Sequence, residues 1–281
     1  MSTLRNIQGL AEVADQYGVL LVDQFGTLHD GQTPYPHAAN ALERYRATGG
    51  KVIVLSNSAK SGDDNRERLK GFGFDERHFD AVVTSGDAAQ AAMRTGALGS
   101  AFQPGGKIHI SGKPGADYGF GAFGFSIVWP DDADGIILAA CQEPDRNWRQ
   151  QIRDLLGAAR RGVTVAVCNP DLEMLTPKGV RPSAGAIALE LARAGAVLHT
   201  FGKPHIDIYR TALAAAGNPP PSAVLAIGDS PEHDLQGAAN AALDGALVRT
   251  GIMVGQDDAA LLPRLPKRTE RPWLSLPELR W

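Results

Sequence analysis

Short runs of consecutive apolar residues, each ending in a polar loop, are the most regular feature of the chain. They cover residues 19–22, 52–55 and 224–227. Runs of this length and composition favour β-strands that are covered on both faces, as in a parallel sheet. Stretches with helical patterning at residues 38–46 and 63–70 follow the first two runs. The alternation predicts βαβ units, and therefore an α/β fold with a Rossmann-like, doubly wound parallel-sheet core.

The middle of the chain predicts a second α/β domain, inserted into the first. Gly- and Phe-rich stretches at residues 95–106 and 114–124 indicate irregular connections. The pattern then alternates again, with strands expected at 135–139, 163–167 and 197–200 and helices at 146–161 and 183–194. We therefore predict a core formed by residues 1–90 and 199–281, and an inserted domain of residues 91–198. The segment from Asp257 onward is expected to be an irregular strap along the core.

Composition and charge narrow the class of protein. Of the 281 residues, 43% are hydrophobic and 21% are charged, which is typical of soluble enzymes. The net charge of −3 argues against a nucleic-acid or membrane partner, because both select a basic face. The first residues lack the features of a signal peptide, and no apolar run is long enough to cross a bilayer. Since two cysteines are too few for a disulfide framework, we expect a cytoplasmic protein.

Polar residues suited to phosphate chemistry follow the predicted strands. The carboxylate of Asp23, held in front of a turn at Gly26, can attack phosphorus and form a covalent aspartyl phosphate. The hydroxyl of Ser56 and the backbone N–H groups near Asn57 and Ser58 can hold a phosphate oxygen. Because ligands bind at the carboxyl ends of strands in open α/β sheets, these positions favour a shared site.

Two further strings add charges of both signs. Lys203, between a glycine and a proline, offers a point charge to a phosphate. Asp229 and Asp234 follow an apolar run, and Mg²⁺ prefers one or two carboxylates with water and a substrate phosphate. Taken singly, each string has an ordinary structural explanation, as a turn, a helix cap or a surface lysine. Their order, each at the end of a predicted strand, is what indicates a site.

Together these strings resemble the haloacid dehalogenase-like (HAD) superfamily of hydrolases over nearly the whole chain. They are most similar to its class IIA branch, the nucleotide- and sugar-phosphate phosphatases with a large α/β cap between the second and third motifs. The inserted domain would then be the cap. The strings that carry the resemblance are Leu55-Ser56-Asn57-Ser58, Cys168-Asn169-Pro170-Asp171, Phe201-Gly202-Lys203-Pro204-His205, Gly228-Asp229-Ser230 with Asp234, and Arg249-Thr250-Gly251.

The resemblance implies a magnesium-dependent phosphatase that acts on a small phosphorylated metabolite through an aspartyl phosphate at Asp23. Ser56 would bind the transferring phosphoryl group, with Asn57 and Ser58 beside it in the substrate site. Lys203 would balance the charge of Asp23 and of the phosphate. The resemblance leaves a homodimer formed through the cap as an open prediction.

The resemblance also implies the residues around the metal and the substrate. Mg²⁺ would be held by Asp23, Asp229 and the backbone carbonyl of Phe25, with Asp234 behind them or acting through water. The cap would contact the substrate at Asn169 and Asp171, for which a proline turn with local hydrogen bonds is the alternative explanation.

Phe25 departs from the pattern, because phosphatases of this superfamily usually carry a second aspartate there as general acid. Three interpretations follow. The substrate has a good leaving group, such as an acyl or aryl phosphate; another residue, with His29 and Asp30 closest in sequence, supplies the proton; or the protein binds a phosphorylated ligand with little catalysis. An aromatic residue here also resembles the dehalogenases, which need no metal. We rank the phosphatase first, the binding protein second and the dehalogenase third.

Overall fold

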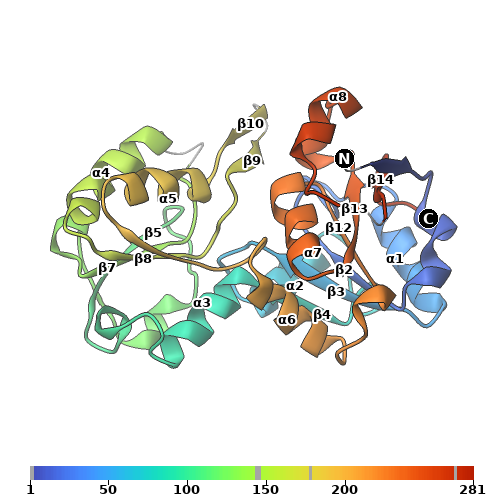
Figure 1. Cartoon of the computed structure of the whole chain (residues 1–281). Helices are drawn as coiled ribbons and strands as arrows, with labels where there is room; N and C mark the ends of the chain where they lie inside the picture. The colour runs from blue at the N-terminus through green and yellow to red at the C-terminus, as the bar shows by residue number, and fades with distance from the viewer. Residues whose placement is uncertain (1–2, 143–146, 177–178, 269–270) are drawn as a thin grey trace. The chain divides into compact units, whose positions relative to one another are not determined.

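The computed structural model describes residues 3–142, 147–176, 179–268 and 271–281. The chain forms two compact units (Figure 1). The first unit comprises Met1–Ser56, Gly62–Val83 and Lys203–Trp281, and the second comprises Asn57–Ser61 and Thr84–Gly202. Within the described residues, no helix combines the length and the apolarity needed to cross a membrane.

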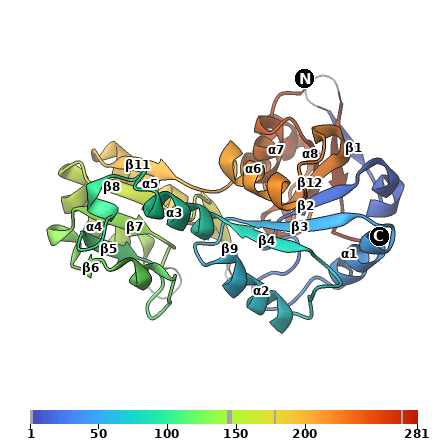
Figure 2. The ribbon, with the colours of Figure 1, turned by 90° about the horizontal axis from the view of Figure 1, so that it is seen from below.

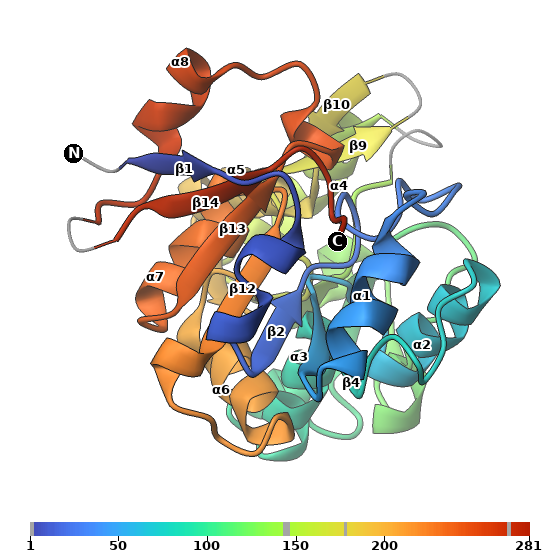
Figure 3. The ribbon, with the colours of Figure 1, turned by 90° about the vertical axis from the view of Figure 1, so that its right-hand side faces the viewer.

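A seven-stranded sheet forms the centre of the first unit, in the order β1-β14-β13-β12-β2-β3-β4. The pairs from β1 through to β3 are all parallel, and Figure 3 shows β1 beside β14 at one edge. The strands are β1 (Leu4–Asn6), β2 (Val19–Val22), β3 (Lys51–Ser56), β4 (Ala81–Thr84), β12 (Val224–Gly228), β13 (Asp244–Val248) and β14 (Trp273–Leu276). The helices of this unit are α1 (Ala38–Ala47), α2 (Gly62–Gly71), α6 (Ile206–Ala215), α7 (Gln236–Asn240) and α8 (Asp258–Leu261).

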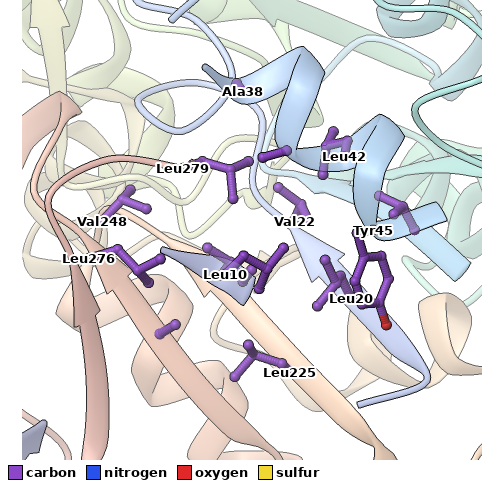
Figure 4. Close-up of a cluster of buried hydrophobic side chains, with 14 of the residues drawn as sticks. Leu10, Leu20, Val22, Ala38, Leu42, Tyr45, Leu225, Val248, Leu276 and Leu279 are labelled. Atoms are coloured by element: carbon purple, nitrogen blue, oxygen red, sulfur yellow. The ribbon is translucent and has the colours of Figure 1, made fainter. Parts of the chain in front are cut away.

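Alternate residues of each strand enter two different hydrophobic clusters, because side chains of a strand point to opposite faces. On β2, Leu20 and Val22 pack toward α1 and α2, whereas Val19 and Leu21 pack toward α6 and α7. Figure 2 shows these helix pairs on opposite sides of the sheet, and Figure 4 shows the cluster around α1. Burial on both faces explains why these strands are continuous apolar runs.

The second unit is built around a five-stranded sheet in the order β11-β8-β7-β5-β6, with parallel pairs throughout. Helices α4 and α5 cover one face, and α3 covers the other. Its strands are β5 (Lys107–Ser111), β6 (Ser126–Ile127), β7 (Gly135–Leu138), β8 (Thr164–Val167) and β11 (Val197–Thr200), with an antiparallel pair β9 (Glu173–Thr176) and β10 (Gly179–Pro182). Its helices are α3 (Ser85–Arg94), α4 (Trp148–Arg160) and α5 (Ala184–Arg193).

The structure confirms the α/β fold class with a Rossmann-like parallel sheet in the core. All the strands expected from apolar runs form, with ends that differ by at most one residue. The expected helix at 146–161 begins at Trp148 as α4, and Arg146 lies outside the described residues. The expectation of an irregular strap after Asp257 is wrong, because this segment contains α8 and β14, whose Trp273 is fully buried in the sheet.

The edges of the compact units differ from the predicted domain ranges 1–90, 91–198 and 199–281. Helix α3 belongs to the second unit from its first turn, since Ala89 and Met93 pack into that unit's core. Strand β11 belongs there too, because it pairs with β8 along its whole length. The short segment 57–61 is also part of the second unit, which no pattern in the sequence indicated.

Candidate active site

The site lies where the strand order of the first sheet reverses. From β2 the chain proceeds outward through β3 and β4, whereas from β12 it proceeds in the other direction through β13 and β14. Strands β2 and β12 are neighbours, with Val22 paired to Ile227, and the Asp23 N–H donates to the Ile227 carbonyl at 2.8 Å. Asp23 and Asp229 therefore leave two adjacent strands at the crevice where open α/β sheets bind ligands.

The turn after Asp23 depends on Gly26. This residue has φ of +89°, in the left-handed region that favours glycine. A Cβ at this position would also overlap the Asp229 carboxylate. Inside the turn, the Thr27 hydroxyl donates to Asp23 Oδ2 at 3.5 Å. The turn thus allows the two acidic loops to approach closely while it orients the Asp23 carboxylate.

Asp234 is brought back toward the strand ends by a π-helical turn, Pro231–Leu235. Single π-turns are frequent at functional sites. The Ser230 N–H donates to Asp234 Oδ2 at 3.0 Å, and the Ser230 hydroxyl accepts from the His233 N–H at 3.2 Å. A Cβ at Gly228 would overlap the Asp234 carboxyl group, so the glycine before Asp229 makes room for this side chain.

Lys203 joins the acidic residues. Its Nζ donates to Asp23 Oδ1 at 2.5 Å and to Asp234 Oδ1 at 2.7 Å. The Lys203 side chain is only 3% exposed. One carboxylate oxygen from each of Asp23, Asp229 and Asp234 lies within 4.8 Å of the others. Four side chains from three separate chain segments therefore share one small buried volume.

The formal charges of these four side chains do not cancel one another. Three carboxylates and one ammonium leave two formal negative charges. Burial, followed by the nearby charges of Asp23 and Asp234, raises the pKa of Asp229 well above its ordinary value, although the Ile252 N–H and Lys203 oppose this. A divalent cation would complete the balance. The donor set of carboxylate oxygens fits Mg²⁺, with Asp23, Asp229 and Asp234 as the residues able to hold or back it.

The loop after β13 fastens the two acidic loops to each other. Thr250 donates its hydroxyl to the Gly26 carbonyl at 2.6 Å. The Ile252 N–H donates to Asp229 Oδ2 at 2.8 Å, and the Gly251 N–H donates to the Tyr35 hydroxyl at 3.1 Å. The sequence indicated this loop only through the Arg249-Thr250-Gly251 string. Ile252 acts through its backbone, and Tyr35 lies outside every motif, so neither gave a signal.

Phe25 and His29 belong to the wall of the Asp23 loop. The rings of Phe25 and His29 meet in a T-shaped arrangement, and His29 stacks on Phe72 with ring centroids 4.4 Å apart. His29 is fully buried, and burial followed by the charge of Arg68 lowers its pKa to about 4. His29 is not part of the cluster formed by Asp23, Asp229 and Asp234, and its ring is neutral at physiological pH.

Of the remaining predicted residues, Ser56 lies in the first unit, and the four predicted to contact the substrate lie in the second. Ser56 is buried at the carboxyl end of β3, next to β2, and so lies at the same sheet edge as Asp23. Asn57 lies in the second unit, where its Nδ2 donates to Asp171 Oδ1 at 2.7 Å.

Ser58 and Asn169 form hydrogen bonds within the second unit, Ser58 to the start of α3 and Asn169 to its own loop. The Ser58 carbonyl accepts from the Ser85 hydroxyl and from the Gly86 N–H. The Asn169 side chain accepts from the Asp171 N–H at 3.1 Å, which is the local hydrogen bond of a proline turn. Asn57 and Asp171 are thus brought together, whereas Asn169 stabilises its own loop.

Comparisons with known proteins agree with this geometry. A haloacid dehalogenase-like hydrolase family model matches residues 20–126, and a HAD hydrolase-like model matches residues 200–269. The D-glycerol 3-phosphate phosphatase of Mycobacterium tuberculosis is 26% identical over 246 residues, which are 86% of this chain and 66% of that protein. The match thus spans slightly less than two thirds of that relative. The acid sugar phosphatase of Staphylococcus aureus is 27% identical over 248 residues, which are 86% of this chain and 90% of that protein.

Solved structures extend the similarity to both units. A haloacid dehalogenase-like family hydrolase from Brucella suis is 27% identical with a TM-score of 0.82, covering 97% of this chain and 99% of that one. The glycerol phosphate phosphatase of Mycobacterium tuberculosis in complex with magnesium is 25% identical with a TM-score of 0.62, covering 89% of this chain and 71% of that one. The two family models together match more than half of the chain, on both sides of its middle segment. The chain belongs to the haloacid dehalogenase-like (HAD) hydrolases.

Proposed function

We propose that this hydrolase is a Mg²⁺-dependent phosphatase that acts on a small phosphorylated metabolite through an aspartyl phosphate at Asp23. The observation that carries this proposal is the buried cluster of three carboxylates around the Lys203 ammonium. Phosphoryl transfer requires mainly positioning and charge stabilisation, and this cluster offers both. The names of the curated relatives, both phosphatases, support the same reaction.

In the proposed reaction, Asp23 attacks the phosphorus atom with one carboxylate oxygen. The bond between phosphorus and the leaving oxygen breaks, and its electron pair departs with that oxygen. Water then attacks the phosphorus of the aspartyl phosphate, which releases inorganic phosphate and restores the Asp23 carboxylate. Lys203 holds Asp23 in place and offsets the charge that gathers on the phosphoryl oxygens. Ser56, at the same sheet edge, binds the transferring group.

A divalent cation would be held by Asp23, Asp229 and the Phe25 carbonyl, with Asp234 behind them. When bound, it neutralises the carboxylates and the phosphoryl oxygens. The magnesium complex of the Mycobacterium tuberculosis phosphatase supports this choice of ion. We propose that the second unit is the substrate-reading cap and that Asn57 and Asp171 act in it as a hydrogen-bonded pair. We propose a cytoplasmic location, in keeping with two cysteines that are both buried as thiols.

The test is phosphate release from a panel of acyl, aryl and sugar phosphates, with Mg²⁺ and with EDTA. We expect turnover that requires Mg²⁺ and that falls at least about 10³-fold in Asp23→Asn, because the nucleophile is lost. Asp207→Asn, an exposed aspartate paired with Arg210, is the matched control and is expected to retain activity.

Two results would contradict the phosphatase. Binding of a phosphorylated compound without turnover of any panel member would favour the phospholigand-binding protein. Chloride release from 2-chloropropionate in EDTA would favour the dehalogenase.

A further inference from the structure

Phe25, two positions after Asp23, is an apolar side chain that is packed against its own loop. The Phe25 ring lies against the backbone of Gly31, where any Cβ would overlap it. Its other neighbour is the His29 ring, at a centroid distance of 5.6 Å and an interplanar angle of 88°. Held between these residues, Phe25 can neither give nor accept a proton at the mouth of the nucleophile loop.

His29 cannot act as the proton donor in place of residue 25, because both of its ring nitrogens are engaged within the loop. Nδ1 accepts a hydrogen bond from the Gly31 N–H at 2.9 Å, which places the ring proton on Nε2. The Gln24 side-chain nitrogen Nε2 lies 3.2 Å from His29 Nε2, and the buried Gln24 Oε1 has no hydrogen-bond partner. With the amide turned by 180°, Oε1 faces the ring and accepts the Nε2–H, so that this ring nitrogen is also engaged within the loop. The ring is fully buried and both of its nitrogens are engaged within its own loop, so it does not serve a substrate as a proton donor.

Asp30 is the other acid near Asp23 in the sequence, and its carboxylate accepts hydrogen bonds from the turn that follows it. Its Oδ1 accepts from the N–H groups of Gln32 and Thr33 at 2.8 and 2.7 Å. Its Oδ2 accepts from the Thr33 hydroxyl at 3.2 Å. A carboxylate that accepts three hydrogen bonds is stabilised in its ionised form and makes a poor proton donor. Within the described Asp23 loop, then, the leaving oxygen finds no general acid.

We propose that the substrate is a phosphate whose leaving group departs as a stable anion, namely an acyl or aryl phosphate. This inference rests on the phosphatase function proposed above. When the phosphorus–oxygen bond breaks, the electron pair stays on a carboxylate or phenolate oxygen, which needs no proton from the protein. An alkyl phosphate, such as a sugar or glycerol phosphate, would leave as a strongly basic alkoxide. General acid catalysis contributes about 10²–10⁴-fold to such a step, and alkyl substrates lose this contribution here.

The experiment measures kcat/KM for acetyl phosphate, a series of substituted phenyl phosphates and glycerol 3-phosphate, in the wild type with Mg²⁺. We expect kcat/KM to rise steeply as the leaving-group pKa falls, and glycerol phosphate to be turned over at least about 10²-fold more slowly than acetyl phosphate. Equal values for phenyl, 4-nitrophenyl and glycerol phosphate would overturn the inference while leaving the phosphatase intact. Absence of turnover on every member would instead refute the phosphatase.

Two variants at position 25 separate proton donation from loop geometry. Phe25→Asp supplies a carboxyl group, and we expect it to flatten the dependence on leaving-group pKa and to raise alkyl turnover relative to acyl turnover about 10-fold or more. Phe25→Leu supplies none, and its dependence is expected to stay as steep as that of the wild type. A flattened dependence in Phe25→Leu, or a wild-type dependence that is already flat, would contradict the proposal.

Discussion

At the scale of single residues, Lys203 makes the acidic cluster possible. Its ammonium contacts two of the three carboxylates and is almost completely buried, so the attraction is little screened by water. Removing one partner of such a buried network leaves charges with no compensation, which is far costlier than losing a surface pair. Substituting Lys203 is therefore expected to cost far more stability than substituting a lysine on the surface.

Lys203→Met is expected to reduce both activity and stability. The Asp23 and Asp234 carboxylates then face each other without the ammonium between them, which costs about 3 kcal/mol or more of folding stability. We expect Mg²⁺ to restore part of this loss, and kcat to stay at least about 10²-fold below wild type. Thermal unfolding with and without Mg²⁺ measures the first effect and steady-state kinetics the second. Lys70→Met, which removes an exposed pair with Glu67, should change little; equal effects of the two substitutions would contradict the account.

Asp229→Asn, in contrast to Lys203→Met, is expected to stabilise the metal-free protein. It removes one of three crowded negative charges, so the melting temperature in EDTA should rise by a few degrees. The same change removes a ligand, so the stabilisation of the wild type by Mg²⁺ should largely disappear. A variant that melts below the wild type in EDTA and still gains fully from Mg²⁺ would show that the carboxylates do not share a cation.

At the scale of elements, the site is formed by the loops that follow β2, β12 and β13, which are hydrogen-bonded to one another. The Thr250 hydroxyl bonds the Asp23 loop, and the Ile252 N–H bonds Asp229. Two glycines, Gly26 and Gly251, have positive φ and approach Asp229 so closely that neither could carry a Cβ. Small displacements of one loop are therefore transmitted to the carboxylates of another.

Thr250→Val is expected to lower kcat about 10-fold with little change in KM, because the Gly26 carbonyl loses its hydrogen bond and Asp23 becomes less well positioned. Thr211→Val is the matched control, since Thr211 donates the same kind of hydrogen bond to the Asp207 carbonyl on the exposed face of α6. Steady-state kinetics of both variants, with melting temperatures to confirm folding, provide the check. An unchanged kcat in Thr250→Val would mean that this contact does not orient the nucleophile.

The elements that the sequence revealed are those whose residues signal burial directly. Strands β2, β3 and β12 are buried on both faces and therefore form continuous apolar runs, and the residues after them are the predicted acids and serine. Strand β14 was missed because prolines surround it and the buried Ser275 interrupts its apolar run. Its place was decided by pairing with β1 and β13, segments from the two ends of the chain.

For the site, the sequence likewise predicted the residues that follow buried strands and missed those whose placement depends on packing. The convergence of Asp23, Lys203, Asp229 and Asp234 follows from strand order, which the motifs indicated. The bonds from Ile252 and Tyr35 could not be predicted, because backbone donors and solitary hydroxyls leave no pattern. The position of His29 also required the structure, since only the packing of Phe72 shows that its ring is enclosed.

At the scale of the whole molecule, a buried acid holds together segments that are far apart in the chain. Asp244, at the start of β13, accepts from the Tyr17 hydroxyl at 2.9 Å and from Arg271 at 2.8 Å, and it also pairs with Arg268. Burial alone would raise the pKa of Asp244, but the hydrogen bonds from Arg268, Tyr17 and Arg271 outweigh it and lower the pKa. This network ties the C-terminal segment, including β14, to the core sheet.

Asp244→Asn is expected to cost about 2 kcal/mol or more at neutral pH, because three donors lose a charged acceptor. Since the folded-state pKa of Asp244 is lowered, this stability is fully present above the ordinary aspartate pKa of 3.8 and is lost as pH falls through the lower value. The difference in melting temperature between wild type and variant should thus narrow from pH 7 toward pH 3. Asp207→Asn, on the surface, should leave the melting temperature close to that of the wild type. A difference between wild type and Asp244→Asn that widens in acid would refute the stabilising role of the Asp244 carboxylate.

The central claim for the molecule is that Asp23 becomes phosphorylated during turnover. The most direct measurement is acid quenching of the wild type while it turns over acetyl phosphate with Mg²⁺, followed by mass spectrometry of its peptides. We expect one added phosphoryl group on the peptide that contains Asp23, and we expect it to be absent in EDTA and in Asp23→Asn. A phosphoryl group on any other residue, or undiminished turnover in Asp23→Asn, would contradict it.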